Sequence, residues 1–174
     1  GSVNTNGLTT TGNTTLSSSG TVTQSQKIAA AGLELLGSGT FTLTNTGSAN
    51  AISTLAANTG VVSFTQGTAY SVATVNSTTG ITTSGNLALV GSAGMTIGAN
   101  ISTGAGAQTY TGPITLSTGS ITLSSTNTAI LFSGSTSTID GARALTINNG
   151  SARITFGGTV GQTTAISSLS LQGT

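Results

Sequence analysis

Residues 3–16 read VNTNGLTTTGNTTL, and residues 75–89 read VNSTTGITTSGNLAL. With one inserted residue the two stretches match at both ends, Val3-Asn4 onto Val75-Asn76 and residues 7–13 onto residues 80–86. Internal copies in a strand-rich chain indicate a solenoid, in which each repeat is one supersecondary unit that stacks on the next. Solenoid units contact only their neighbours, so such a chain is typically built for length rather than around one chemical site.

Weaker copies support the same interpretation. Residues 39–52 (GTFTLTNTGSANAI) are similar to residues 119–130 (GSITLSSTNTAI) and, more distantly, to residues 150–166. The segment AISTL at Ala51 returns as AISSL at Ala165. The spacings are uneven but compatible with a unit of about 20–24 residues, within the range of β-helix-type repeats.

The chain is filled with short segments in which apolar residues alternate with Thr or Ser, as in residues 40–44. This period of two places the apolar side chains on one face of a strand, and β-branched Thr suits the other. The same alternation recurs at residues 121–123, 144–147, 153–156 and 169–171. For residues 26–36 (QKIAAAGLELL) we weigh a helix against strand–turn–strand. We favour the second, because Gly32 interrupts the helix and Leu33 and Leu35 keep the period of two.

A continuous β domain can be a sandwich, a barrel or a solenoid. Sandwich strands are joined by variable loops and show no internal copies, whereas this chain has copies, very short segments and a single proline. We therefore expect residues 1–174 to form one all-β domain, a right-handed parallel β-helix of roughly 7–9 coils of about 20–24 residues. With coils about 4.8 Å apart, eight coils give a rod about 38 Å long.

The charge content is very low. Only 3% of the residues are charged and the net charge is +1, which gives no electrostatic reason to expect nucleic acid or an anionic membrane as partner. Hydrophobic residues make up 35% of the chain, enough for a core, so the low charge does not indicate disorder. No apolar run approaches the length of about 18 residues that a spanning helix needs, so we expect no membrane insertion.

The residue types available exclude most catalytic chemistry. The chain has no Cys and no His, which removes disulfides, Cys/His zinc sites and His-based acid–base catalysis. Its two carboxylates, Glu34 and Asp140, fall about five coils or about 24 Å apart on the expected rod, too far for a glycosidase pair. They are also too few for repeated calcium turns. Lys27 has no motif around it that would make it the base for a Ser nucleophile, and for Asp140 and Arg143 we favour a solvated turn over an ion pair. We expect no enzyme, no catalytic residue, no metal site and no cofactor.

Two patterns raise other possibilities. Four N-x-S/T sequons begin at Asn13, Asn76, Asn100 and Asn149; in so Ser/Thr-rich a chain, turn residues are the favoured interpretation and glycosylation the alternative. Aligned Thr at positions 40, 42 and 44 suggests an ice-binding face, but such a face needs Thr in register on every coil, and the uneven repeat spacing argues against it.

Three stretches share one repeat texture: residues 22–47 (VTQSQKIAAAGLELLGSGTFTLTNTG), residues 52–66 (ISTLAANTGVVSFTQ) and residues 144–173 (ALTINNGSARITFGGTVGQTTAISSLSLQG). This texture resembles the repeats of filamentous-haemagglutinin-like proteins. These are large bacterial surface exoproteins of the two-partner secretion type. The resemblance covers nearly the whole chain but rests on repeat texture and not on one exclusive motif. It implies a parallel β-helix shaft, export across the outer membrane, and a role in adhesion or surface filaments. The secretion domain at the start of such exoproteins is not evident.

The sequence thus leads to one main hypothesis and one alternative. The main hypothesis is a structural shaft segment of an extracellular bacterial surface filament or adhesin, cut from a longer repeat protein and associating head to tail into fibres. The alternative is a binding module whose solenoid face recognises glycans, on a host cell or other surface, or ice. With aromatics at 3%, a platform for stacking sugars is poorly supplied.

Overall fold

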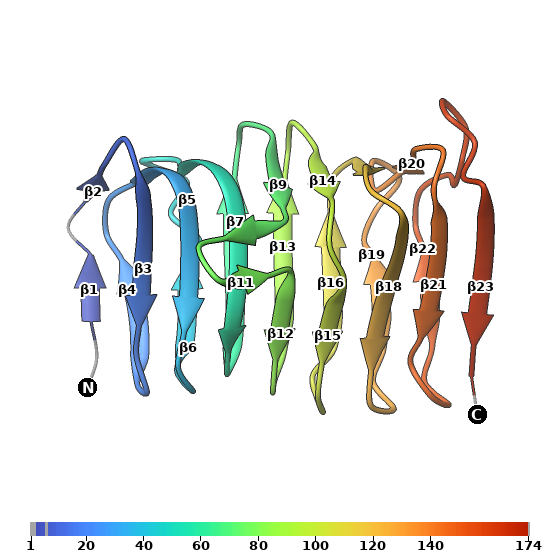
Figure 1. Ribbon diagram of the computed structural model, residues 1–174, viewed down its shortest axis with the longest axis horizontal. Helices are drawn as coiled ribbons and strands as arrows, with labels where there is room; N and C mark the ends of the chain where they lie inside the picture. The colour runs from blue at the N-terminus through green and yellow to red at the C-terminus, as the bar shows by residue number, and fades with distance from the viewer. Residues whose placement is uncertain (1–2, 6, 174) are drawn as a thin grey trace.

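The computed structural model describes residues 3–5 and 7–173, and within them every regular element is a β-strand. The chain winds into a parallel β-solenoid of eight coils. In Figure 1 it runs down the front and up the back while it advances from the N-terminus on the left to the C-terminus on the right, which makes the winding right-handed. The expected fold class is confirmed. The right-handed sense is the one that parallel strand connections almost always take.

Each coil contributes strands to three faces. Face 1 is an eight-stranded parallel sheet with the order β1 (Val3–Thr5), β4 (Thr21–Gln24), β6 (Thr40–Leu43), β8 (Val61–Gln66), β13 (Leu87–Gly91), β16 (Gln108–Thr111), β19 (Ile130–Phe132) and β22 (Ile154–Phe156). Faces 2 and 3 belong to one larger sheet, because β5 (Ile28–Leu36) and β7 (Ala51–Thr59) bend from one face to the other.

The remaining strands sort onto these two faces. Face 2 continues with β2 (Leu8–Thr9), β9 (Tyr70–Val72), β14 (Met95–Ile97), β17 (Ile114–Leu116) and β20 (Ile139–Asp140). Face 3 continues with β3 (Asn13–Ser17), β12 (Ile81–Thr83), β15 (Ile101–Thr103), β18 (Ser120–Ser125), β21 (Ala144–Asn148) and β23 (Ser168–Gln172). An antiparallel hairpin, β10 (Thr74–Val75) and β11 (Thr78–Thr79), leaves the coil between β9 and β12.

Coil length varies more than the repeats suggested. On face 1, Val22 pairs with Phe41, 19 positions along, whereas Val62 pairs with Leu87, 25 positions along. On face 1 the longest step is the one that carries the hairpin. The expected unit of about 20–24 residues is therefore close to the observed coil lengths. Coils with more or fewer residues differ at their corners, while their strands stay in register.

The interior is a set of side-chain columns, one residue per coil. On face 3 the inward positions align as Leu16, Leu35, Ala57, Ile81, Ile101, Leu123, Ile147 and Leu171. On face 1, Tyr110, Phe132 and Phe156 stack with successive ring centroids 5.2 Å apart and planes inclined by 16° and 4°. Each fully buried aliphatic or aromatic side chain contributes about 1.5–3 kcal/mol, and the burial is shared between neighbouring coils, so stability is collective.

A ladder of glycines lines the corner where face 3 turns into face 1. Its members are Gly20, Gly39, Gly60, Gly85 and Gly106, in register by the pairing of the strands that follow them. A Cβ on Gly60 would lie 2.3 Å from the carbonyl oxygen of Ser38, and one on Gly106 would lie 2.0 Å from that of Gly85. Successive backbones meet so closely here that no side chain fits between them.

The copies that first indicated a solenoid are not its structural repeat. Val3 lies in β1 on face 1, but Val75 lies in the hairpin; Leu8 lies in β2 on face 2, but its counterpart Ile81 lies in β12 on face 3. All three faces require the same local pattern, with an apolar residue inward, Thr or Ser outward and Gly at the corner. Similar sequences therefore recur on different faces. Within residues 26–36 the strand β5 covers Ile28–Leu36, so this stretch is extended and not helical, as expected. The expected turn does not divide it into two strands: β5 is continuous and bends between its pairing with β2 and its pairing with β3.

Candidate functional site

The charged residues do not converge. Glu34 lies in β5 in the second coil and Asp140 in β20 in the seventh, so the two carboxylates are five coils apart, as predicted. Among the described residues there is no group of three or more acidic side chains that could hold a metal ion. The carboxylate of Asp140 accepts hydrogen bonds from the backbone N–H groups of Thr163 (2.8 Å) and Thr164 (3.0 Å), and not from Arg143. Asp140 thus orders the loop of the last coil.

Glu34 is the one charged side chain that is buried among the described residues, with 3% of its surface exposed. The hydroxyls of Thr15 and Thr78 each donate to its carboxylate at 2.7 Å, and the amide of Asn76 donates at 2.9 Å. These bonds, the one from Asn76 most of all, lower the pKa of Glu34, because they favour the charged form more than burial disfavours it. The period of two in β5 places Glu34 on the outer side of the rod, so the sequence predicts exposure there. The carboxylate is buried because something else covers it.

The cover is the β10–β11 hairpin, called the strap from here on and comprising residues 73–80. Its base is closed by a hydrogen bond from Gly80 N–H to the carbonyl of Ala73 at 2.9 Å, and its tip turns at Asn76, which has φ 51°. In Figure 1 the strap lies crosswise in front of β7. Ala56 points outward from β7 and yet is fully buried, and Val75 of the strap is 2% exposed.

The other buried polar side chains are bonded to the backbone around them. The carboxamide of Gln66 accepts from Ile52 N–H and donates to the carbonyl of Ile52, both at 2.8 Å. Asn50 accepts from Ile28 N–H at 3.0 Å and donates to the carbonyls of Leu43 (3.1 Å) and Thr65 (3.0 Å). These amides take the place of missing strand bonds at a corner, which is a structural role.

Two tyrosines lie inside the rod. The hydroxyl of Tyr110 donates to Gln108 Oε1 at 2.7 Å. The buried hydroxyl of Tyr70 has no hydrogen-bond partner in the described part of the chain, and its ring packs edge-on against Phe64 at 5.2 Å. Burial raises the pKa of both phenols well above 10, so neither ionises near neutral pH. The aromatic rings serve the core, and none forms an exposed platform for sugars.

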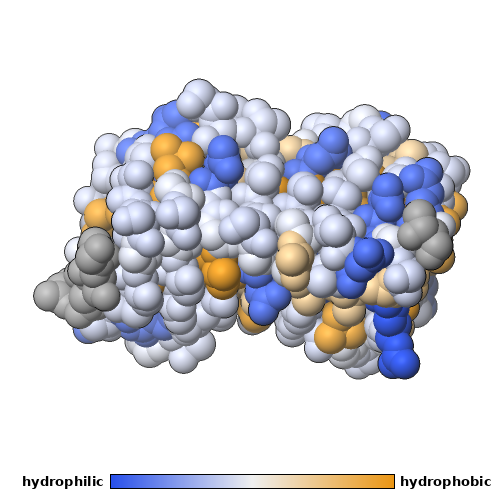
Figure 2. Space-filling model, turned by 90° about the horizontal axis from the view of Figure 1, so that it is seen from below, coloured by the Kyte–Doolittle hydropathy of each residue, from blue (hydrophilic) through white to orange (hydrophobic). Residues whose placement is uncertain are grey.

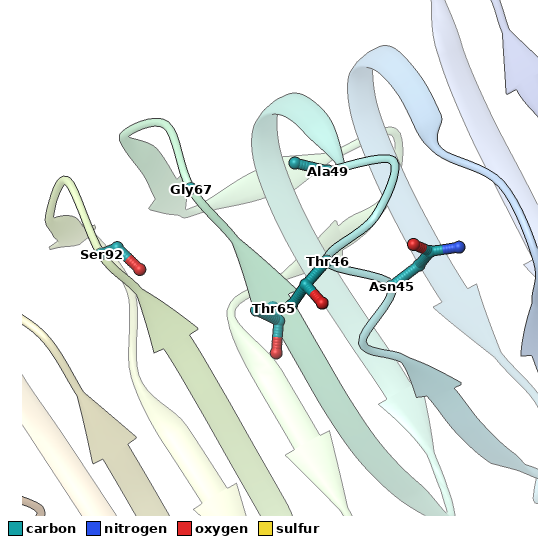
Figure 3. A pocket seen from close by; sticks show the side chains of 6 residues that line it. All are labelled: Asn45, Thr46, Ala49, Thr65, Gly67 and Ser92. Carbon is teal, nitrogen blue, oxygen red and sulfur yellow. The ribbon is translucent and has the colours of Figure 1, made fainter.

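A shallow hollow of about 120 Å³ opens where the β6–β7, β8–β9 and β13–β14 loops meet. Figure 3 shows its lining residues, which are Asn45, Thr46, Ala49, Thr65, Gly67 and Ser92. None of them is charged or aromatic, and the amide of Asn45 is already bonded to Ser25 of the β4–β5 loop and to Ser48 of its own loop. The side chains that line the hollow are small and uncharged, and their polar groups are the hydroxyls of Thr46, Thr65 and Ser92 and the amide of Asn45.

The four sequons lie in different environments. Asn13 and Asn76 are exposed and bonded to each other, Nδ2 to Oδ1, at 2.9 Å. Asn100 is exposed and accepts from Thr122 N–H at 2.9 Å. Asn149 is 1% exposed, and its amide donates to the carbonyls of Ala152 (2.9 Å) and Arg153 (3.2 Å). Asn149 is thus a buried turn residue whose amide nitrogen is covered in the folded chain.

The outward threonines of face 1 are in register but interrupted. The column through β4 to β22 reads Thr23, Thr42, Ser63, Ala88, Thr109, Leu131 and Thr155. Ala88 and Leu131 break it, so the condition of Thr on every coil is not met. Seen from below (Figure 2), the surface is mostly pale, the colour of Ser, Thr and Gly, with scattered blue and orange residues and no large patch of either kind.

Comparisons of the chain with protein-family models, with curated proteins and with solved structures found no match. In the part of the chain that the structure describes, no helix is long and apolar enough to cross a bilayer.

Proposed function

We propose that this chain is a structural shaft segment of a secreted bacterial surface filament or adhesin. The observation that carries the proposal is the uninterrupted stacking of eight coils. Nearly every buried polar side chain of the described residues forms hydrogen bonds within the rod. The resemblance to filamentous-haemagglutinin-like repeats supports the surface location. On this proposal the chain contributes length, rigidity and a sparsely charged, hydroxyl-rich outer surface.

Rigidity follows from the way the coils are joined. Parallel ladders run the whole length of the rod on three faces, so bending in any direction stretches backbone hydrogen bonds on one side. The length is set by the number of coils at about 4.8 Å each. A molecule of this kind suits a spacer that holds another domain away from a surface.

End-to-end association is part of the proposal. The inward column of face 3 continues into β23, where Leu169 is 41% and Leu171 52% exposed. A further coil stacked on β22 and β23 would bury both leucines and pair the strand edges. With five charged residues in the whole chain, little repulsion opposes such stacking.

Light scattering of the purified chain over a range of concentrations tests the association. We expect growth to fibres, with a 4.8 Å reflection in fibre diffraction, and we expect Leu171→Lys to suppress it. Ser170→Lys adds the same charge on the outward side of the same strand and serves as the control. A monodisperse monomer at high concentration contradicts end-to-end association.

The shaft function is tested in the encoding bacterium. Antibodies against the chain should label intact cells, and deleting residues 87–107, one full coil between Leu87 and its partner Gln108, should leave a folded, exported protein with a rod shorter by about 4.8 Å. Labelling only after permeabilisation, or loss of a specific ligand-binding activity on deletion of this coil, contradicts the proposal.

A further inference from the structure

The strap makes contacts that skip coils. Asn76 lies in the fourth coil, yet its amide bonds to Glu34 in the second coil, 42 positions away, and to Thr15 in the first, 61 positions away. Asn13 of the first coil donates to Asn76 across 63 positions, and Thr78 donates to Glu34 across 44. Outside the strap, the side-chain hydrogen bonds between described residues join positions at most 27 apart, as from Ser137 to Tyr110. Those bonds reach no further than the adjacent coil.

Packing follows the same path as the hydrogen bonds. Val75 rests on Gly32 of the second coil, where an added Cβ would lie 2.8 Å from Val75 Cγ1. The strap also contacts β7 of the third coil and covers Ala56 there. The first four coils are thus joined by one segment, in addition to the ladders between neighbours.

Glu34 is the anchor of these contacts. It is buried without a cation, and its carboxylate is held by neutral donors from two directions, Thr15 of the first coil and Asn76 and Thr78 of the strap. Hydrogen bonds to a charged acceptor are about twice as strong as those between neutral groups. The elements packed against it, β3, β7 and the strap, present Thr15, Ala56, Asn76 and Thr78, so no other titratable group faces it.

We propose that the strap is a clamp that couples the first four coils into a single cooperative unit. A solenoid with contacts only between neighbours loses its end coils one at a time, because each coil is held by one interface. Here the loss of the first coil also breaks the bonds of Thr15 and Asn13 to the fourth, so the first four coils open together. In a filament under tension, the clamp would resist unravelling of the rod, and this role rests on the proposed shaft function. The coupling of the four coils does not depend on that function.

The test is native-state hydrogen exchange of the purified chain, read by mass spectrometry on peptides from each coil. Asn76→Gly removes the three hydrogen bonds of the Asn76 side-chain amide. Glycine also adopts the φ of 51° at this position without strain. Asn127 has the same φ of 51°, and its Oδ1 accepts from Ser151 N–H in the adjacent coil, so Asn127→Gly is a matched control that breaks no contact beyond neighbouring coils.

In the native chain we expect β3, residues 32–36 and the strap to exchange with one common protection factor. In Asn76→Gly we expect the exchange rate in β3 and residues 32–36 to rise by about 10- to 100-fold, because the stabilisation from hydrogen bonds to a charged group is lost. We also expect the rates to become graded, fastest in the first coil and slower in each coil further inward. Asn127→Gly should leave these segments unchanged. If Asn76→Gly does not fold, Thr78→Val, which removes one bond to Glu34, should give a smaller change in the same segments.

The proposal is overturned if the substitution speeds exchange in the strap alone while β3 and residues 32–36 keep their protection. It is equally overturned if the coils already exchange in a graded series in the native chain. Neither result bears on export or surface display, so the clamp and the shaft function can fail separately.

Discussion

The glycine ladder gives a sharp test of how the coils pack. A Cβ on Gly60 would lie 2.3 Å from Ser38 O and 2.6 Å from Gly39 O, whereas ordinary contact begins at 3.4 Å. In Gly60→Ala the corner must therefore open by about 1 Å. This opening loosens the bond from Val61 N–H to Gly39 O (3.1 Å) and that from Gly85 N–H to Gly60 O (2.8 Å).

The magnitude follows from these two effects. Overpacking costs about 1–3 kcal/mol and each weakened backbone bond about 0.5–1.5 kcal/mol. The alanine regains about 0.4–1 kcal/mol by restricting the unfolded chain. We expect a net loss of about 2–4 kcal/mol, which for a chain of this size lowers Tm by roughly 5–15 °C.

Urea unfolding followed by circular dichroism measures the loss, and Gly67→Ala is its control. Gly67 is exposed, has an ordinary φ and nothing within 4 Å of an added Cβ, so its substitution should stabilise the chain slightly, by about 0.4–1 kcal/mol. If Gly60→Ala lies within about 0.5 kcal/mol of the native chain, or if the two substitutions act alike, close backbone approach at the corner is refuted.

Three further predictions concern the interior and the anchor. Phe132→Ala removes the middle ring of the aromatic stack and should cost about 3–5 kcal/mol, measured by calorimetry; a loss below about 1 kcal/mol would mean that the stack contributes little. Gln66→Leu leaves Ile52 N–H and C=O unpaired and should cost about 2–4 kcal/mol in urea unfolding, and a neutral result would show that other groups satisfy them. The lowered pKa of Glu34 stabilises the fold above the pKa of the unfolded chain, near 4.5, and this contribution is lost as pH falls through the lower folded value. The difference in stability between the native chain and Glu34→Gln should therefore be constant near neutrality and shrink below about pH 4; a difference independent of pH contradicts the anchor role.

The strands and the winding could be predicted because they depend on local pattern. Alternation such as that of residues 40–44 fixes which side chains point inward, and β6, β18, β21, β22 and β23 formed where that pattern stands. Which segment stacks on which could not be predicted, because Leu8 and Ile81 satisfy the same local rule on different faces. Strand pairing depends on register between residues far apart in the sequence. Because the corners differ in length, the spacing of residues along the chain does not reveal which strands pair.

The strap is the clearest case of this limit. Residues 75–76 repeat the dipeptide of residues 3–4, and the repeat alone gives the two dipeptides no different positions in a coil. The structure places them in an insertion that crosses its neighbours. Burial of Glu34 follows from that insertion, so no property of β5 alone could have indicated it. The separation of Glu34 and Asp140 by five coils follows from their spacing along the chain alone, and that separation was predicted correctly.

The varying coil length has a consequence for how such a chain can change. One step along face 1 takes 19 residues in one place and 25 in another, yet the strands of both coils stack at the same rise. Extra residues therefore widen the rod without lengthening it. Girth and length are independent variables of this architecture: whole coils alter reach, and corner insertions alter only what the rod presents along its side. A corner such as residues 134–136, which is exposed, is on this reasoning a place where a peptide can be grafted for display at a fixed distance from the end.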